Sequence, residues 1–578
     1  MFRQLLADLA KHAFRYGRNG VCCTEFYLNS DFIMSANEPA KPNANALYFG
    51  DNLDVLREHI KDESVDLVYL DPPFNSARDY NVLFASPKGE QSEAQIVAFK
   101  DSWHWGEQAE REYSEILRGQ NSNAAVMMEA LRQLLGENDM MAYLVMMTNR
   151  LLELHRVLKS TGSLYLHCDP TASHYLKIVL DCVFGKENLR NEIIWQRTNA
   201  HNFKSRQFPR VRDAIFFYSK SDKYSYKQLY SDFSKNQLSR YVEESDTGRL
   251  YTGQDLTIIG GDLSPWRGTT PKPPRGWGLS LSERERLWKE GLILTRKDGS
   301  PRLDGKKVWL DEKEGVPVTD LWTDIARIAN TSKERLGYPT QKPLALLERI
   351  ISASSNEGDV VLDPFCGCGT ATHAAQKFGR QWIGIDITHL AITLIEKRLK
   401  DAFPGIAFYV HGTPKDLEGA RDLARRDKYQ FQWWACSLVN AQPYQGKKKG
   451  ADGGIDGLIF FQDEAKAHKK IMVSVKGGEK VDVVMIRELA HVVEREKAEI
   501  GLFVTLTQPT KPMVMEAVKA GYYTSPVTGK EFRKLQILTV AGLLNGNERA
   551  EYPDFSYGAT TFKKAKVEAK AGKQGNLL

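Results

Sequence analysis

The apolar positions of the chain alternate between short continuous runs and helical spacing. ALYFGDNLDVLREHI, from Ala46, predicts a short strand, a turn at Gly50–Asp51 and a helix. SVDLVYLDPPF predicts a second, buried strand that runs into a double proline. Two prolines cannot continue a strand ladder, so Asp71 is expected at the carboxyl end of that strand. After a helical pattern over 138–160, GSLYLHCD and TASHYLKIVLDCVFG predict another strand and helix.

From Ile193 the pattern changes. EIIWQR and AIFFYSK predict paired strands joined by a basic connection, and residues 220–335 are polar with little periodicity. The alternation resumes with LALLERIISAS, VVLDPFCGCGT, WIGIDI and a further helix. Strands and helices alternating at this spacing predict a doubly wound α/β sheet.

A further unit begins near Gln430 and ends near Asn545. QFQWWACSLV predicts a helix, GADGGIDGLIFF a glycine turn entering a strand, and IMVSVKGG a second strand. IRELAHVVEREKAEIGLFVTLT adds a helix and a third strand. The tail FKKAKVEAKAGKQGNLL is basic and lacks an apolar face, which is typical of disordered chain. Residues 1–45 predict an amphipathic helix and an irregular stretch, and indicate no role.

Composition narrows the class of protein. The 578 residues are 42% hydrophobic and 26% charged, which is typical of a soluble globular protein of up to about four folding units. No run reaches the about 18–20 apolar residues of a membrane span, and the N-terminus lacks a secretion signal. The seven cysteines form neither a disulfide framework nor a zinc spacing. We therefore expect a cytoplasmic protein with no membrane segment. A net charge of +6 permits a polyanion partner without requiring one.

VVLDPFCGCGT ends a predicted strand and opens a helix. Gly367 and Gly369 would let the backbone turn tightly and approach a ligand at the helix N-terminus. Asp386 ends the next strand, where a carboxylate can accept hydrogen bonds from ribose hydroxyls. Thr372 stands where a dinucleotide fingerprint needs a third glycine, which weakens NAD or FAD. A purely structural turn is the alternative for the glycines alone, and the acid favours a nucleoside ligand.

Asp71-Pro72-Pro73-Phe74 is the sharpest local signal. A carboxylate at a strand tip, rigid prolines and an aromatic ring form a compact pocket for a planar amine. The Asp71 carboxylate and the Pro72 carbonyl could both accept from an exocyclic NH2, which frees the nitrogen lone pair for attack, while Phe74 stacks on the base. The alternative is a strand followed by an ordinary proline turn.

Together the two motifs resemble the DNA amino-methyltransferases that use S-adenosylmethionine, over most of residues 46–400. The catalytic element comes first and the cofactor loop last, which resembles the permuted beta group. GDNLDVL, NEIIWQR, RDAIFFYSK, LWTDI and YPTQKPLALLERII agree with that family. The resemblance implies a Rossmann-like methyltransferase sheet with an inserted target-recognition region.

The resemblance also implies a set of cofactor-binding residues. The methionine part of S-adenosylmethionine would be cradled by Asp363, Phe365, Gly367, Gly369 and Thr370. Asp386 would hold its ribose and Asp51 its adenine, and Gln341 and Lys342 lie in the segment that covers it. Cys368 replaces the usual serine, and both residues are small.

The implied chemistry is direct in-line displacement, in which the amine attacks the sulfonium methyl and no protein nucleophile takes part. Methylation at carbon 5 of cytosine would need a thiolate, usually in a Pro-Cys pair, and none of the seven cysteines follows a proline. An acid at the first motif position goes more often with N6 of adenine, and N4 of cytosine is the alternative. The base must flip out of its duplex.

Basic residues interleaved with His201, Phe203 and Phe208 suit phosphate contact plus stacking or wedging beside a flipped base. The predicted DNA-binding residues are Arg197, Lys204, Arg206, Arg210 and Arg212. Arg267, Lys272, Arg275 and Trp277 follow in a proline-rich loop. A solvated basic face is the alternative, but the position between the two halves favours double-stranded DNA as the partner.

The C-terminal unit resembles Mrr-type restriction endonucleases of the PD-(D/E)xK fold over about residues 430–525. That resemblance implies that Asp456 is the metal-binding acid and that Lys476 is the lysine that stabilises the developing charge or orients water. Gln432 stands at a helix position that often carries Glu. Ser474 stands where Glu or Gln belongs, and a hydroxyl is a poor ligand for Mg²⁺. We expect DNA binding with weak or absent Mg²⁺-dependent cleavage. A restriction–modification enzyme that also cuts is the alternative.

These features predict six parts: an extension (1–45), a catalytic half (46–220), a target-recognition region (221–335), a cofactor-binding half (336–415), an endonuclease-like domain (420–550) and a basic tail (551–578). Two other hypotheses are a nucleic-acid-binding module that catalyses no reaction, and a methyltransferase whose substrate is RNA or a free nucleotide. The long insertion between the two motifs favours duplex DNA as the substrate. A homodimer and a restriction–modification partner subunit stay open.

Overall fold

A computed structural model describes residues 45–73, 78–85, 91–101, 103–199, 206–244, 246–329, 332, 334–336, 338, 340–444, 454–463, 468–553 and 567–568. The helix predicted near the N-terminus and most of the basic tail lie outside the described residues.

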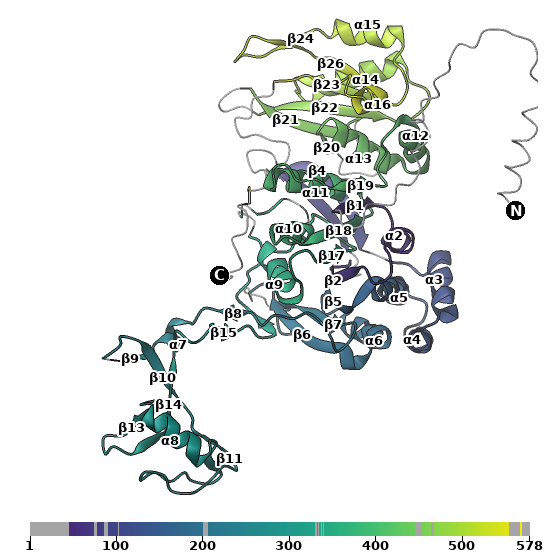
Figure 1. Ribbon diagram of the computed structural model, residues 1–578. Helices are drawn as coiled ribbons and strands as arrows, with labels where there is room; N and C mark the ends of the chain where they lie inside the picture. Colours follow the sequence, from purple (N-terminus) through teal and green to yellow (C-terminus); the bar gives the residue numbers. More distant parts are fainter. Residues whose placement is uncertain are drawn as a thin grey trace, which may run out of the picture. The chain divides into compact units, whose positions relative to one another are not determined.

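The largest sheet has nine strands, and its strand order is far from the order along the chain (Figure 1). From edge to edge it runs β16 (Leu321–Trp322), β6 (Leu189–Gln196), β7 (Arg212–Ser219), β5 (Leu158–Cys168), β2 (Val65–Leu70), β17 (Val360–Asp363), β18 (Gln381–Asp386), β1 (Ala46–Phe49) and β19 (Tyr409–His411). Within these nine strands β7 alone runs antiparallel to its neighbours. The expected pairing of EIIWQR with AIFFYSK is confirmed by β6 and β7.

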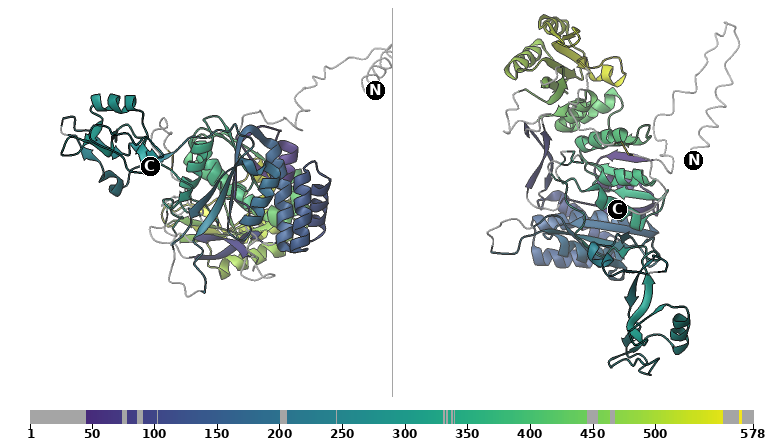
Figure 2. Two further views of the ribbon diagram at one scale, coloured as in Figure 1. Left: turned by 90° about the horizontal axis from the view of Figure 1, so that it is seen from below. Right: turned by 90° about the vertical axis from the view of Figure 1, so that its left-hand side faces the viewer.

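Helices cover both faces of this sheet, as Figure 1 shows. One face packs against α2 (Asn52–His59), α3 (Glu107–Arg118), α4 (Ser122–Leu135), α5 (Asp139–Val157) and α6 (Ser173–Phe184). The other packs against α9 (Leu344–Ser354), α10 (Thr370–Lys377) and α11 (His389–Ala402). Helices α3 to α6 lie side by side, blue in the left view of Figure 2. Two apolar cores separated by one sheet confirm the predicted doubly wound α/β fold.

Local chemistry explains where these elements begin and end. The Asn138 side chain accepts a hydrogen bond from the Met141 amide at 2.9 Å and caps α5. Strand β2 stops at Leu70 because Pro72 and Pro73 have no N–H to donate. Asp71 therefore lies at the carboxyl end of β2, as predicted.

Residues 220–335 contain more structure than their weak periodicity suggests. Strands β13 (Ile293–Thr295), β14 (Pro301–Trp309), β10 (Leu250–Gln254) and β9 (Val242–Glu243) form a four-stranded sheet beside α8 (Leu281–Lys289). Two-stranded pairs join β8 (Tyr230–Ser231) to β15 (Val316–Pro317) and β11 (Thr257–Ile259) to β12 (Arg275–Trp277). A small apolar core stabilises this region, and its buried members are Leu256, Trp266, Trp277, Leu287 and Ile293. Period-based prediction misses it because its apolar residues are few and widely spaced.

The C-terminal unit has its own five-stranded sheet, in the order β20 (Gln442–Pro443), β21 (Gly457–Gln462), β22 (His468–Lys476), β23 (Ile500–Thr505) and β26 (Leu535–Thr539). One face packs against α12 (Leu417–Arg426), α13 (Lys428–Leu438) and α16 (Val540–Leu544). The other packs against α14 (Val483–Arg495) and α15 (Lys511–Lys519). Within this unit β24 (Tyr522–Thr524) pairs with β25 (Glu531–Arg533). Far earlier in the chain, outside this unit, β3 (Arg78–Ala85) pairs with β4 (Gln91–Asp101). The predicted helices and strands of this unit are confirmed.

Candidate active site and nucleic-acid interface

The two motifs meet where the connections of the nine-stranded sheet diverge. Strands β2 and β17 are parallel neighbours, with Val68 opposite Leu362. From β17 the chain passes through α10 to β18 on one side, whereas β2 pairs with β5 on the other. Ligands of open α/β sheets bind at the carboxyl ends of strands at such a switch point. The DPPF loop and the glycine loop both leave the sheet there.

Asp71 has two carboxylate oxygens in unequal surroundings. Its Oδ2 accepts a hydrogen bond from the Lys342 ammonium, and both side chains are largely buried. Its Oδ1 is buried and has no hydrogen-bond partner among the described residues. A buried acceptor without a donor is costly, so Oδ1 is a position at which a ligand N–H would be stabilised. Phe74 of the same motif lies outside the described residues.

The glycine loop turns tightly between β17 and α10. Gly367 and Gly369 have φ of 50° and 71°, in the left-handed region that favours glycine. A Cβ at Gly367 would approach the buried Tyr338 ring to 3.1 Å, and one at Gly369 would approach Ile395 to 2.8 Å. The Asp363 carboxylate, at the end of β17, accepts from the Phe365 amide at 3.1 Å. Burial raises the pKa of Asp363 well above its usual range.

Asp386 joins this loop to the next strand end. Its Oδ2 accepts from the Gly367 amide at 2.9 Å, and its Oδ1 accepts from the Thr388 amide and hydroxyl, each at 2.9 Å. Burial raises the pKa of Asp386 to about 6, and the hydrogen bonds from Thr388 and Gly367 oppose that rise. The carboxylate thus lies beside the glycine loop, and Oδ2, which accepts one hydrogen bond, keeps an acceptor lone pair.

Asp51 lies at the end of the neighbouring strand, since Phe49 of β1 pairs with Asp386 of β18. It caps α2 by accepting from the Leu53 amide at 2.8 Å. Both its oxygens also accept from Arg150 of α5, at 2.9 and 3.1 Å. Sequence reasoning missed Arg150, although a basic residue in the apolar pattern of α5 was a usable signal.

The segment before α9 supports the site in two ways. Gln341 accepts from the Leu336 amide and donates to the Glu334 carbonyl, both at 2.8 Å, so it holds its own loop together. Lys342, next to it, reaches Asp71. The structure therefore links this segment to the DPPF loop as well as to the glycine loop, where the Thr370 hydroxyl lies 3.5 Å from the Lys342 carbonyl.

Arg398 of α11 is a second residue that sequence reasoning missed. It is buried, and its guanidinium donates to the Cys368 carbonyl at 3.0 Å and to the Thr370 hydroxyl at 3.2 Å. It also approaches His373 at 3.2 Å. Burial lowers the pKa of Arg398. Its place on the apolar face of a predicted helix was the available signal, because a charged residue there needs an internal partner.

The predicted DNA-binding residues fall into two groups. Arg206 and Arg210 are exposed and Arg212 is half-buried, and none of the three has a carboxylate partner in the part of the chain that the structure describes. The Arg197 guanidinium, by contrast, lies 3.6 Å from the Asp213 carboxylate. Phe208 is 95% exposed between Arg206 and Arg210. Lys204 lies outside the described residues.

The second basic stretch is mostly paired within its own region. Arg267 donates to Glu285 at 2.7 Å, and Arg275 to Asp255 at 2.9 Å. Trp277 is 2% exposed and packs against Trp266, so it belongs to the small apolar core of this region.

Asp456 of the C-terminal unit is buried among hydrogen-bond donors. It accepts from Gln432 at 2.9 Å, from the Val475 amide at 2.7 Å and from the Ser474 hydroxyl at 3.4 Å. Lys476 lies two residues beyond Ser474, on the same face of β22. The fold brings Gln432, Asp456 and Ser474 into contact, but no cluster of three or more metal-ligating His, Cys, Asp or Glu side chains occurs within the described ranges.

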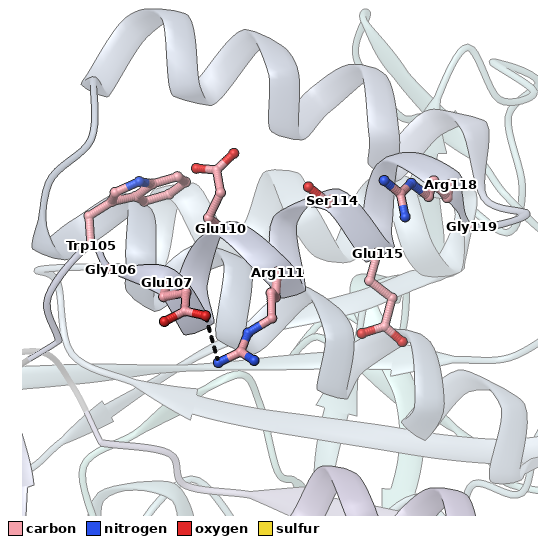
Figure 3. Close-up of a pocket in the computed structure, with 9 residues that line it drawn as sticks. All are labelled: Trp105, Gly106, Glu107, Glu110, Arg111, Ser114, Glu115, Arg118 and Gly119. Carbon is pink, nitrogen blue, oxygen red and sulfur yellow. Dashed lines mark ion pairs between the residues drawn. The ribbon is translucent and has the colours of Figure 1, made fainter.

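A surface hollow of about 780 Å³ lies along α3, between Trp105 and Gly119 (Figure 3). It is lined by both carboxylates and guanidiniums, including the Arg111–Glu107 ion pair at 3.8 Å. None of its residues belongs to either predicted site.

Comparison with known proteins decides the family. Residues 65–397, more than half of the chain, match the model of a family described as DNA methylase. The chain belongs to this DNA methylase family. Residues 423–535 match a second family model, described as restriction endonuclease. Both resemblances drawn from the motifs are therefore confirmed.

Individual relatives match this chain over shorter stretches. The type II methyltransferase M.EcaI of Enterobacter cloacae is 31% identical over 264 residues, which cover 44% of this chain and 57% of M.EcaI. The DNA adenine methyltransferase YhdJ of Escherichia coli is 48% identical over 118 residues, 19% of this chain and 38% of YhdJ. The chain spans about half the length of the curated relatives it matches.

Among solved structures, the cytosine-N4-specific PvuII DNA methyltransferase is 12% identical with a TM-score of 0.32, covering 61% of this chain and 86% of that one. No helix among the described residues combines the length and apolar character needed to cross a bilayer.

Proposed function

We propose that this DNA methylase transfers a methyl group from S-adenosylmethionine to the N6 amine of an adenine that has flipped out of double-stranded DNA. The observation that carries the proposal is the Asp71 carboxylate beside the glycine loop, with Oδ2 held by Lys342 and Oδ1 buried without a donor from the residues that the structure describes. A free, oriented acceptor at a strand tip is what an exocyclic amine requires.

Asp71 and Pro72 would act on the target amine. Its two N–H groups would donate to Asp71 Oδ1 and to the Pro72 carbonyl, which draws the nitrogen lone pair out of conjugation with the ring. Lys342 would fix the rotation of the carboxylate, so that Oδ1 stays aimed at the amine. Pro73 would keep the loop rigid, and Phe74 would stack on the base.

The residues around the glycine loop fit S-adenosylmethionine, which supplies a methyl group on a sulfonium. The close approaches at Gly367 and Gly369 leave backbone where a side chain would fill the space. Asp386 would accept from the ribose hydroxyls and Asp51 from the adenine amine. The proposed set is Asp51, Gln341, Lys342, Asp363, Phe365, Gly367, Gly369, Thr370 and Asp386.

The cysteines support direct transfer without a protein nucleophile. Cys366 and Cys368 lie closest to the site in sequence, and burial raises the pKa of both thiols. A neutral buried thiol is a poor nucleophile. Adenine is proposed on the motif tendency for an acid at position 71, and similarity to an adenine methyltransferase supports it.

The test incubates the full-length protein with labelled S-adenosylmethionine and mixed duplex DNA, then digests the DNA to nucleosides. Label on N6-methyladenine is expected. Label on N4-methylcytosine would replace adenine by cytosine and leave the mechanism intact, whereas no label on either base would overturn the proposed function.

For the C-terminal unit we propose DNA binding without efficient cleavage. Asp456 already accepts from Gln432, Val475 and Ser474, and no group of three or more metal-ligating His, Cys, Asp or Glu side chains occurs among the described residues. Mg²⁺ prefers carboxylate oxygens and water in an octahedral shell, so these residues do not fit a magnesium site. Lys476 would then contact a DNA phosphate.

A further inference from the structure

A chain of buried polar side chains crosses three neighbouring strands beneath the candidate active site. The Tyr69 hydroxyl of β2 lies 3.1 Å from His167 Nδ1 of β5, and His167 Nε2 lies 3.2 Å from Asp213 Oδ2 of β7. All three side chains are buried. Tyr69 lies one residue before the end of β2 and precedes Asp71 by two residues.

This network contains a carboxylate that needs a cation. Asp213 is fully buried, and the Arg197 guanidinium lies 3.6 Å from its Oδ1. Burial alone would raise the pKa of Asp213, but the His167 hydrogen bond and the charges of Arg197 and Lys342 hold it below its usual value. Removing one partner of a buried ion pair leaves an uncompensated charge, which is strongly unfavourable.

Arg197 also lies at the base of the basic connection between β6 and β7. Its backbone amide donates to the Val211 carbonyl at 2.9 Å, which closes the base of that connection. Its side chain is 43% exposed but turns to Asp213, whereas Arg206, Arg210 and Arg212 have no carboxylate partner among the described residues. The arginines of this connection therefore differ in their surroundings.

We propose that Arg197 is a positioning residue, not a phosphate contact. It links the start of the basic connection between β6 and β7 to Asp213. Through His167 and Tyr69 it is linked further to β2, the strand that Asp71 follows. The inference rests on the proposed function and refines it. It separates arginines that contact DNA phosphates, such as Arg210, from Arg197, which aligns the bound DNA with the Asp71 carboxylate.

The test compares Arg197→Ala with Arg210→Ala in the full-length protein. Both variants remove one guanidinium from the same connection. The salt dependence of the duplex Kd and the kcat and KM of methyl transfer are measured for each. A phosphate contact releases counterions, so Arg210→Ala should reduce the slope of log K against log salt by about 0.9 and act mainly on KM. Arg197→Ala should leave that slope unchanged and lower kcat at least about tenfold.

Asp213→Asn provides an independent check. It should lower kcat as Arg197→Ala does, and the double variant should be no worse than Asp213→Asn alone, because the two residues act as a unit. Arg197→Lys, which keeps the charge, should recover part of kcat. If Asp213→Asn does not fold, as judged by thermal unfolding, the salt slope and kcat of Arg197→Ala decide.

A reduced salt slope with normal kcat in Arg197→Ala would overturn the inference, as would additive losses in the double variant. Failure of the proposed function is distinguishable from this. If the wild type transfers no methyl group, the salt slopes of Arg197→Ala and Arg210→Ala still separate the two roles. If the wild type methylates DNA and Arg197→Ala keeps its kcat, only the inference fails.

Discussion

At the scale of single residues, the carboxylates of Asp71 and Asp386 have different hydrogen-bond partners, and this difference indicates different roles. Asp71 has a buried oxygen without a hydrogen-bond partner among the described residues, whereas both oxygens of Asp386 are held by the glycine loop and Thr388. One carboxylate is thus free for a substrate amine, and the other is part of the proposed cofactor site. Substitutions at the two positions should affect different measurements.

We predict that Asp71→Ala lowers the rate of methyl transfer at least about 10²-fold, because the amine loses an oriented acceptor in a buried site. The cofactor Kd should change less than about threefold. Isothermal titration with S-adenosylmethionine and single-turnover rates measure the two effects. Asp386→Ala is the matched control and should weaken cofactor binding first. Equal loss of affinity and rate in Asp71→Ala would mean that its role is misassigned.

The raised pKa of Asp386 predicts a pH-dependent cofactor affinity. Ribose hydroxyls donate best to the ionised carboxylate, so affinity should fall as the pH drops through about 6, by up to about tenfold per unit. The nearby His389 should not titrate in this range, because burial and, to a smaller extent, the charge of Arg426 lower its pKa to about 3. Titrations from pH 5 to 8 check this. The same pH dependence in Asp386→Asn would show that another group is responsible.

At the scale of elements, the glycine loop depends on its contacts with α11 and with the segment before α9. Arg398 of α11 binds the loop carbonyl at Cys368, and Tyr338 packs over Gly367. These contacts leave little room for a side chain. Gly369 precedes α10 with φ of 71°, and an added Cβ would lie 2.8 Å from Ile395 and 2.9 Å from Thr372.

Gly369→Ala should therefore reduce the free energy of unfolding by about 1–3 kcal/mol and weaken cofactor binding. Gly358→Ala is a matched control, since Gly358 has φ of 85° and nothing within 4 Å of an added Cβ. It should lose stability from the backbone conformation alone and keep cofactor affinity. Urea denaturation and cofactor titration compare the two. Similar cofactor affinities in both variants would contradict the role of the loop.

At the scale of the whole molecule, the chain combines a unit that belongs to the DNA methylase family with a unit that matches restriction endonucleases. The arrangement around Asp456 favours DNA binding in that unit, because its carboxylate is already hydrogen-bonded and Ser474 takes the place of a second metal ligand. The predicted domain boundaries, a homodimer and a restriction–modification partner subunit stay predictions.

We predict that the full-length protein binds plasmid DNA but shows no robust cutting of it in excess Mg²⁺. Asp71→Ala is the appropriate background, because it removes methylation that could protect the substrate. Agarose gels report cleavage, and electrophoretic mobility reports binding. Strong Mg²⁺-dependent cutting that disappears on Asp456→Ala would overturn this prediction.

The sequence by itself determined the doubly wound sheet, the positions of both loops and the second unit. Apolar periodicity is local, and proline and glycine restrict the backbone wherever they occur, so these features could be predicted from short stretches. That Asp71 ends β2 follows from Pro72 and Pro73 alone. The four-stranded sheet within 220–335 could not be predicted, because its core depends on scattered tryptophans.

Only the tertiary structure decided which charges meet. Lys342 and Asp71 are 271 residues apart, and Arg150 and Asp51 are 99 apart, so no local pattern pairs them. The same holds for Arg398 beneath the glycine loop and for Arg197 on Asp213. A basic cluster looks uniform in sequence, but the fold buries a carboxylate beside one member and leaves others exposed. The physical reason is that ion pairing depends on burial and distance, and both are set by packing between distant segments.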